Sequence, residues 1–424
     1  MNILNLKKKD ILLVLFNSML FTIPFPFIIN SISLILFSIF YIYYYRDNFI
    51  FCFNFYLFLP ISYFILVLIL CLLFQNENLF FGIKKNIPFL VIPLFFLNAS
   101  FVKEVDIKTV LKHYSFSFLL VALYFILNAF YCFLLTKDRE LFFFQKLVGI
   151  DQNAIYVSVY ASIAMFYFYS KNNKTILDRI SLVFLLFFIF LLSSKTVIFI
   201  DILLSIIYYF FFSKKNKSVR VLTFVCGFLF ILFSCYFVPQ VNKRVLEEYE
   251  TAFVDNTIND LYSNTKQKTY NVSLKDAYYN KSFKKNQFFP GTAYRVFHIR
   301  LFKEIMNKKK EWFRGLGINN TDLLLHEKYL KYNVFLNQNY FNFHNQYVQS
   351  FAELGLIGLI IVVLMVFFNV YNAIQKQSFL HLAFAFMMLV FFLTEVFLIR
   401  QRGIMFFVSF YCIFNVYKNK NLKE

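Results

Sequence analysis

The residues best suited to chemistry stand where a polar segment passes into a long apolar one, in the stretch FHNQYVQSFAELGLIGLIIVVL at positions 343–364. A titratable cluster at the mouth of a membrane span is costly unless it pairs with other groups or has a function. The polar side chains of this stretch are those of His344, Asn345, Gln346, Gln349 and Glu353. We therefore expect a functional site at this junction.

His344 is the candidate base of this site. Imidazole changes its charge near neutral pH, so a neutral ring can take a proton from a hydroxyl group. The alternative is an interfacial side chain that only caps the span. Glu353 follows nine residues later, which on a helix places it about 13 Å deeper and half a turn away. We expect Glu353 to act in catalysis or to order a neighbouring helix or arginine, and the sequence leaves both roles open.

Arg295 and Arg300 are candidate ligands for an anionic substrate. A guanidinium group is always charged and can bind two phosphate oxygens at once. The two arginines stand five residues apart on an expected helix, so they point about 140° away from each other. We expect Arg295 to face the substrate and Arg300 to pair with Glu304, four residues further on. The alternative is a pair of solvated surface charges.

Three further cations are candidates. Lys195 stands at the outer end of an expected helical hairpin, where it would bind phosphate or only extend to the membrane surface. Arg400 and Arg402 flank the turn after an expected span, against the usual distribution of charge. These two arginines would either bind a lipid phosphate or form an ion pair with Glu395 or Glu353.

The sequence gives no sign of a metal or a cofactor. The histidines carry no metal-ligand spacing with a carboxylate, and we expect His298 on the surface of its helix. All six cysteines lie inside apolar segments, which indicates neither a disulfide framework nor a thiolate metal site.

The composition defines the fold class. Of the 424 residues, 60% are hydrophobic and 16% charged, with 65 Phe, and the apolar segments are about 20 residues long. We predict an all-α polytopic membrane protein with about twelve transmembrane helices. The expected spans are 10–28, 31–46, 52–74, 87–102, 113–135, 153–170, 177–194, 196–213, 219–238, 347–371, 378–398 and 402–417. We interpret the start as a retained first span and not as a signal peptide.

Lys and Arg are more frequent in alternate short loops, which predicts an even number of spans with both ends in the cytoplasm. This topology places residues 239–345 outside, between a membrane part of about nine spans (1–238) and one of about three (346–424). Insertion topology and attraction to anionic lipid head groups explain most of the formal charge of +20, so nucleic acid is not needed to account for it.

The outer loop is expected to contain two helices. It begins with an amphipathic stretch at 241–253, and from 291 to 308 the sequence has helical periodicity, with Phe297, Leu301 and Ile305 on one stripe.

Beyond this helix, Gly315 and Gly317 flank an expected turn. A second short helix is expected from an N-cap at Thr321 to Tyr329.

The stretch FHNQYVQSFAELGLIGL resembles the motif of the O-antigen ligase and O-antigen polymerase superfamily. In that family a His-Asn pair closes a large periplasmic loop, and an Ala-Glu-x-Gly-x-x-Gly segment opens the following span. Arg295 and Arg300, followed by Gly315-Leu316-Gly317, are similar to the family's Arg-bearing helix and Gly-x-Gly turn.

Two segments further upstream extend the resemblance to about residues 150–370. Residues 151–156 resemble the segment that enters the sixth span. Ser193-Ser194-Lys195 stands where relatives usually have Ser-Arg. A Lys at this position keeps the charge but loses the bidentate grip on phosphate.

The resemblance implies a metal-independent glycosyl transfer on the periplasmic face of the bacterial inner membrane. The donor would be a glycan on undecaprenyl diphosphate, and the acceptor a hydroxyl group of lipid A-core or of a second glycolipid. His344 and Glu353 would be catalytic. The diphosphate would be bound by Arg295, Arg300, Lys195, Arg402 and Arg400. The site would be supported by Asn345, Gln349, Gly315 and Gly317.

Three functions remain open at this point. A ligase would move the finished glycan to a terminal acceptor, and we favour it because of the compact His-Asn-x-Tyr and Ala-Glu-x-Gly segment. A polymerase would join lipid-linked repeat units. A transporter or flippase for the same glycans is disfavoured, because the sequence shows no paired repeats with broken helices. A cytoplasmic nucleotide hydrolase is disfavoured because no phosphate-binding glycine-rich loop is present.

Overall fold

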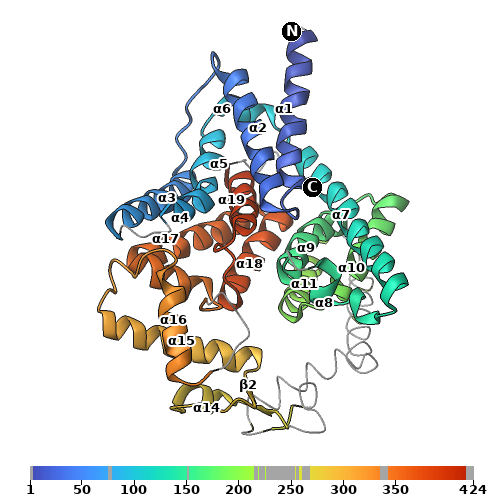
Figure 1. Ribbon diagram of the computed structural model, residues 1–424. Helices are drawn as coiled ribbons and strands as arrows, with labels where there is room; N and C mark the ends of the chain where they lie inside the picture. The colour runs from blue at the N-terminus through green and yellow to red at the C-terminus, as the bar shows by residue number, and fades with distance from the viewer. Residues whose placement is uncertain are drawn as a thin grey trace.

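The computed structural model describes residues 3–74, 79–149, 152–213, 268–334 and 342–416, together with residues 218, 225, 254 and 257–259. Almost every described segment is helical (Figure 1). In these segments the strands are β1 (Tyr270–Asn271) and β2 (Gln287–Phe288), which pair in parallel with Tyr270 opposite Gln287. The all-α prediction therefore holds apart from this two-residue ladder.

The N-terminal half forms a helical assembly. Its helices are α1 (Ile3–Phe21), α2 (Phe27–Tyr45), α3 (Phe55–Phe74), α4 (Leu79–Asn86), α5 (Pro88–Phe96), α6 (Ala99–Glu104), α7 (Ile107–Thr136), the 3₁₀-helix η1 (Arg139–Phe142), α8 (Phe144–Val148), α9 (Ala154–Ser170), α10 (Ile176–Leu192), α11 (Lys195–Ile207) and the π-helix η2 (Tyr208–Phe212).

The second half begins with the loop body, which we define as residues 268–334, and continues with three apolar helices. The loop body contains β1, α14 (Leu274–Tyr279), β2, α15 (Gly291–Lys309) and α16 (Asn320–Lys331). The C-terminal helices are α17 (Gln346–Lys376), α18 (Phe379–Thr394) and α19 (Gln401–Val416).

Five helices in the described part of the chain are long and apolar enough to cross a membrane: α2, α3, α7, α11 with η2, and α17. The shorter apolar helices α9 and α18 add to them. These helices agree with the prediction of a helical membrane protein, whereas the count of twelve spans stays a prediction. The expected span at 219–238 and the amphipathic stretch at 241–253 lie outside the described residues, apart from 225.

Two expected spans are each interrupted in the structure. The segment 10–28 is not one helix, because α1 ends at Phe21 and Pro26, which has no N–H to donate, stands at the N-cap of α2. The segment 87–102 is divided in two, because the side chain of Asn98 accepts a hydrogen bond from the Ser100 N–H and starts a new helix there.

Side-chain caps define several helix starts. Asn153 accepts a hydrogen bond from the Ile155 N–H at the start of α9, and Thr175 forms a capping box with Asp178 at the start of α10. Ser378 caps α18 by accepting a hydrogen bond from the His381 N–H. Each cap satisfies an N–H group that has no partner within its own helix.

The apolar helices share two common ends. At one end the Tyr156 hydroxyl of α9 contacts the Val396 carbonyl, which follows α18. At the other end, the Tyr208 hydroxyl contacts the Ser170 carbonyl at 3.1 Å, and Lys376 Nζ lies 2.7 Å from the Phe414 carbonyl. The starts of α9, α17 and α19 therefore lie at the same end as the last residues of α18, as expected for successive antiparallel spans.

The loop body has an apolar core of its own. Phe297, Leu301 and Ile305 are buried in this core, as their spacing predicted. The expected second helix is present as α16, but its N-cap is Asn319 and not Thr321. In Figure 1 the loop body (yellow to orange) lies below α17, and α18 and α19 (red) lie between the blue N-terminal helices and the green helices α8–α11.

A backbone turn of the loop body meets α17 at a kink. Gly355 has φ +68° within α17, and the Leu356 N–H donates to the Trp312 carbonyl at 3.0 Å. The turn also has positive φ at Gly315 and Gly317, the two glycines expected to flank it. The Gly317 N–H donates to the Glu353 carbonyl at 3.0 Å. These hydrogen bonds fix the loop body on the helix that carries the candidate site.

We expect replacement of Gly355 by alanine to lower the stability of the folded protein strongly. A Cβ atom there would overlap the Phe313 carbonyl oxygen, and the positive φ disfavours an L-residue. Together these effects should cost about 3 kcal/mol or more. Gly149→Ala is the matched control, because Gly149 has φ +79° but a Cβ atom added to it would meet no other atom within 4 Å. Equal shifts in the thermal unfolding midpoint of the two variants would contradict the close approach.

Candidate functional site

His344 begins the site in an unusual backbone conformation. Its φ is +48°, in the left-handed region that non-glycine residues seldom adopt. The His344 N–H donates to Asn342 Oδ1 at 2.9 Å. Asn345 caps α17 by accepting a hydrogen bond from the Val348 N–H at 3.0 Å. These contacts hold the imidazole at the start of α17.

The polar head of α17 connects three other elements. Asn345 Nδ2 donates to the Leu393 carbonyl of α18 at 3.0 Å. Gln346 Oε1 accepts from the Leu398 N–H at 2.7 Å, in the segment before α19. Gln349 Nε2 donates to Thr321 Oγ1 of α16 at 3.1 Å. Asn345 and Gln349, which were expected to support the site, thus bind surrounding segments to α17, and Gln346 does the same.

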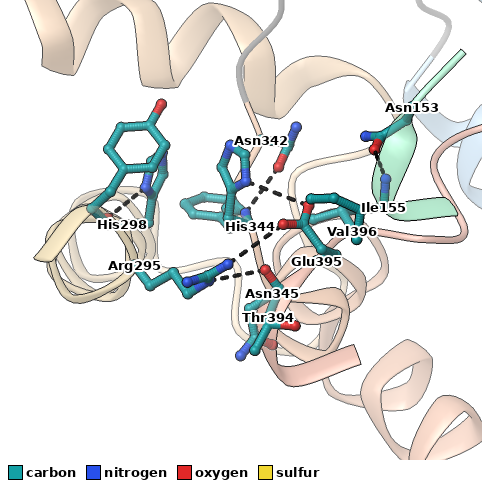
Figure 2. A network of polar contacts seen from close by, with 12 residues as sticks. Asn153, Ile155, Arg295, His298, Asn342, His344, Asn345, Thr394, Glu395 and Val396 are labelled. Atoms are coloured by element: carbon teal, nitrogen blue, oxygen red, sulfur yellow. Dashed lines mark hydrogen bonds and ion pairs between the residues drawn. The ribbon is translucent and has the colours of Figure 1, made fainter. Parts of the chain in front are cut away.

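Three charged or titratable side chains meet here, and we call His344, Glu395 and Arg295 the His–Glu–Arg cluster. Glu395 Oε2 lies 3.7 Å from His344 Nδ1, and Glu395 Oε1 lies 3.4 Å from an Nη of Arg295. Arg295 Nε also donates to the Thr394 carbonyl at 2.9 Å. Figure 2 shows contacts from both the imidazole and the guanidinium group to Glu395, with His298 on the other side of His344.

The side chains of the His–Glu–Arg cluster are partly exposed to solvent. The side chains of His344 and Arg295 are 24% and 29% exposed, and that of Glu395 is 13% exposed. The Glu395 carboxylate interacts with the Arg295 guanidinium group more strongly than it would in solution, because both groups are largely removed from water. The cluster can therefore stabilise a protonated imidazole while part of the ring remains accessible.

Glu395 was not predicted as a partner of His344. It stands 51 residues further along the chain, and from the sequence it was expected only as a partner of Arg400 or Arg402. The available signal was topological: two successive antiparallel helices, α17 and α18, return the chain to the end where α17 begins. Among the described residues, Glu395 pairs with Arg295 and His344.

His298 is buried, so the prediction that it lies on a helix surface is wrong. Its ring is 0% exposed and its centroid lies 5.4 Å from that of His344. Its Nδ1 is 2.8 Å from the Tyr294 carbonyl oxygen, and its Nε2 is 2.6 Å from the Tyr329 hydroxyl. Because a carbonyl can only accept, Nδ1 carries the proton in this arrangement and Nε2 accepts from the tyrosine.

The environment keeps the His298 ring neutral. Burial, together with the adjacent His344, lowers the pKa of His298 from 6.5 to about 3, although the hydrogen bond to the Tyr294 carbonyl opposes this shift. A neutral ring beside His344 adds no positive charge to the cluster.

We expect His298→Gln to remove part of the acid sensitivity of folding. The unfolded chain protonates this histidine below about pH 6.5, whereas the folded protein does so only near pH 3. Between about pH 3 and pH 6.5 the unfolded state therefore binds more protons than the folded state. The contribution of His298 to stability is fully present above this range and is lost as the pH falls through it. Denaturant unfolding at about pH 7.5 and about pH 5 should show a larger loss in the wild type than in the variant.

The acidic residue Asp322 also changes the pH dependence of folding, but it does so equally in the wild type and in His298→Gln. Burial and the Glu353 carboxylate raise the pKa of Asp322 to about 6, against the effect of Lys85. A raised carboxyl pKa stabilises the folded state as the pH falls, which is the opposite sign. Both proteins contain Asp322, so its contribution cancels in the difference, and equal acid losses would contradict the buried neutral ring.

Arg300 belongs to the interior of the loop body. It forms the expected pair with Glu304 at 3.0 Å. Its Nη1 donates to the Asn280 carbonyl at 2.7 Å, and its Nη2 donates to the Tyr332 hydroxyl at 3.1 Å. These contacts position Arg300 within the loop body, whereas Arg295 faces the His–Glu–Arg cluster.

Glu353 lies in a second polar cluster. Its Oε1 accepts from the Asn319 N–H at 3.3 Å, and the Asn319 side chain accepts from Lys85 of α4 at 2.9 Å. Lys85 and Glu353 are both 7% exposed. This arrangement fits the ordering role considered for Glu353, since it connects α4, the turn before α16 and α17.

The other predicted cations, Lys195, Arg400 and Arg402, stand at the same end of the helical assembly as the His–Glu–Arg cluster. Arg402 donates to Gln152 Oε1 at 2.9 Å, which joins α19 to the start of α9. Arg400 is exposed immediately before α19. Lys195 is exposed at the first position of α11. The segments described contain no group of three His, Cys, Asp or Glu side chains that could hold a metal ion.

Comparison with protein families supports the resemblance noted in the sequence. Residues 180–363 match a family described as "O-Antigen ligase". The match includes Arg295, Arg300, His344 and Glu353, and it ends before Glu395. A search of the curated proteins gives no match.

Proposed function

Since the chain is O-antigen ligase-like over residues 180–363, we propose that it is a ligase that transfers a glycan from undecaprenyl diphosphate to an acceptor hydroxyl group. The observation that carries this proposal is the His–Glu–Arg cluster, which places a base, a carboxylate and a permanent cation together where four apolar helices begin or end. Lipid A-core or a similar glycolipid is the proposed acceptor.

His344 acts as the general base in this proposal. Its Nδ1 faces Glu395, so the other ring nitrogen, Nε2, receives the proton of the acceptor hydroxyl. The acceptor oxygen then forms a bond to the anomeric carbon of the donor glycan as the bond from that carbon to the diphosphate oxygen breaks. Glu395 stabilises the imidazolium ion that results.

Arg295 stabilises the departing diphosphate. A guanidinium group carries five N–H donors, and the contacts of Arg295 to Glu395 and the Thr394 carbonyl use its Nε and one Nη. The remaining donors can bind phosphate oxygens as negative charge develops on them. Arg400 and Lys195 are exposed at the same end of the helices and would bind the outer parts of the diphosphate.

The proposed site faces the periplasm, and the proposed location is the bacterial inner membrane. The distribution of Lys and Arg supports this orientation. A cysteine introduced at exposed Lys284 in the loop body should react with a membrane-impermeant maleimide in intact spheroplasts. Reaction only after the membrane has been permeabilised would place the loop body in the cytosol and overturn the proposal.

A polymerase is the second candidate, because the matched family and the proposed chemistry are compatible with joining lipid-linked repeat units. Deleting the gene and separating the surface glycans by electrophoresis distinguishes the two. A ligase deletion should remove all long chains and leave lipid-linked polymer. A polymerase deletion should leave the core with a single repeat unit, and unchanged ladders would exclude both activities.

A further inference from the structure

A pocket lies at the end of the helices opposite to the His–Glu–Arg cluster. It has a volume of about 180 Å³, many times what one water molecule needs. Its lining comes from the first residues of α7 and α18 and the last residues of α9, and includes Lys108, Leu111, Tyr167, Lys171, Ser378 and Leu380. The pocket and the cluster are separated by the length of α18, because Ser378 precedes its first residue and Glu395 follows its last.

The accessible charge at this pocket is positive. Lys108 is exposed. Lys171 pairs with Asp178 at 2.7 Å, but the side chain of the lysine is 36% exposed and that of the aspartate only 2%. The pair therefore presents its ammonium group and hides its carboxylate. The N-terminus of α18 at Ser378 adds the positive end of a helix dipole.

The surroundings of the pocket are apolar. Leu111, Tyr167 and Leu380 contribute to its lining. The adjoining first turns of α10 expose Ile176 and Ile180, which are 73% and 59% exposed. In a helical membrane protein, exposed apolar side chains next to lysines mark the boundary between the lipid chains and the head groups.

We propose that this pocket binds an anionic phospholipid, with its phosphate at Lys108 and Lys171 and the beginning of an acyl chain against Leu111 and Leu380. A soluble anion would gain the same charge interactions but nothing from the apolar lining or from the adjoining exposed surface. The site is separate from the proposed transfer reaction and does not depend on it.

Native mass spectrometry of the purified full-length protein tests the proposal by titration with phosphatidylglycerol or phosphatidylcholine. We expect phosphatidylglycerol to bind more tightly, and Lys108→Gln to weaken it about fivefold, the loss expected for one lysine at an anionic surface. Lys112→Gln is the matched control, because Lys112 is exposed on the same helix but does not line the pocket.

Inorganic phosphate distinguishes a lipid from a free anion. If the proposal is correct, millimolar phosphate leaves the bound phosphatidylglycerol in place. Displacement by phosphate, equal binding of the two lipids, or equal losses in Lys108→Gln and Lys112→Gln would each overturn it. The assay measures binding and not transfer, so its failure would leave the proposed function untouched.

Discussion

Replacing His344 with alanine is expected to lower the rate of glycan transfer by about 10²–10⁴-fold, the range typical for loss of a general base. The imidazole is the group of the His–Glu–Arg cluster that can take the acceptor proton near neutral pH, because the Arg295 guanidinium is always charged and the Glu395 carboxylate is paired with it. Transfer is measured with membranes that contain the variant and a radiolabelled lipid-linked glycan.

The matched control for His344 is His326→Ala. His326 is an exposed histidine on α16 of the loop body, so its loss tests the general effect of removing an imidazole from this region. We expect near wild-type transfer from His326→Ala, and wild-type levels of inserted protein from both variants. Transfer by His344→Ala at the rate of the control would remove His344 from the mechanism.

Replacing Arg295 with alanine is expected to lower transfer by about 10²–10³-fold, as for other groups that stabilise developing negative charge. The same change leaves Glu395 without one of its two partners, so the carboxylate would hold the imidazole less firmly. Arg295→Lys should fall between the alanine variant and the wild type, because Lys keeps the charge but cannot bind two oxygens in the same plane.

Arg314→Ala serves as the control for Arg295. Arg314 is also an arginine of the loop body, but its side chain is 65% exposed and pairs with Glu311 three residues away. Its removal should leave transfer unchanged. A drop in Arg314→Ala as large as that in Arg295→Ala would mean that the loop body responds to its overall charge and not to one positioned guanidinium group.

Local sequence patterns predicted the elements that build the site. The apolar stripe of Phe297, Leu301 and Ile305 predicted α15 and its buried face, because helical periodicity follows directly from residue spacing. The change from polar to apolar residues after His344 predicted the start of α17. The positive φ values of Gly315 and Gly317 agree with the turn that two nearby glycines indicated.

Contacts between distant segments could not be predicted in this way. The pairing of Glu395 with His344 and Arg295 depends on the return of α18 to the start of α17, and no local pattern gives the register of two helices. His298 looked like a surface residue because its burial comes from Tyr329 and His344, which lie on other segments. Gly355 lies within an apolar helix, and no local pattern indicated that the backbone of a distant turn packs against it.

The most direct test of the central claim is a transfer assay with the purified protein in liposomes, an undecaprenyl-diphosphate-linked glycan, and a lipid A-core acceptor. We expect glycan to appear on the acceptor as an equal amount of undecaprenyl diphosphate is released, and we expect Glu395→Gln to slow both together. Product formation that is unchanged in Glu395→Gln, or a donor that stays intact with the wild-type protein, would contradict it.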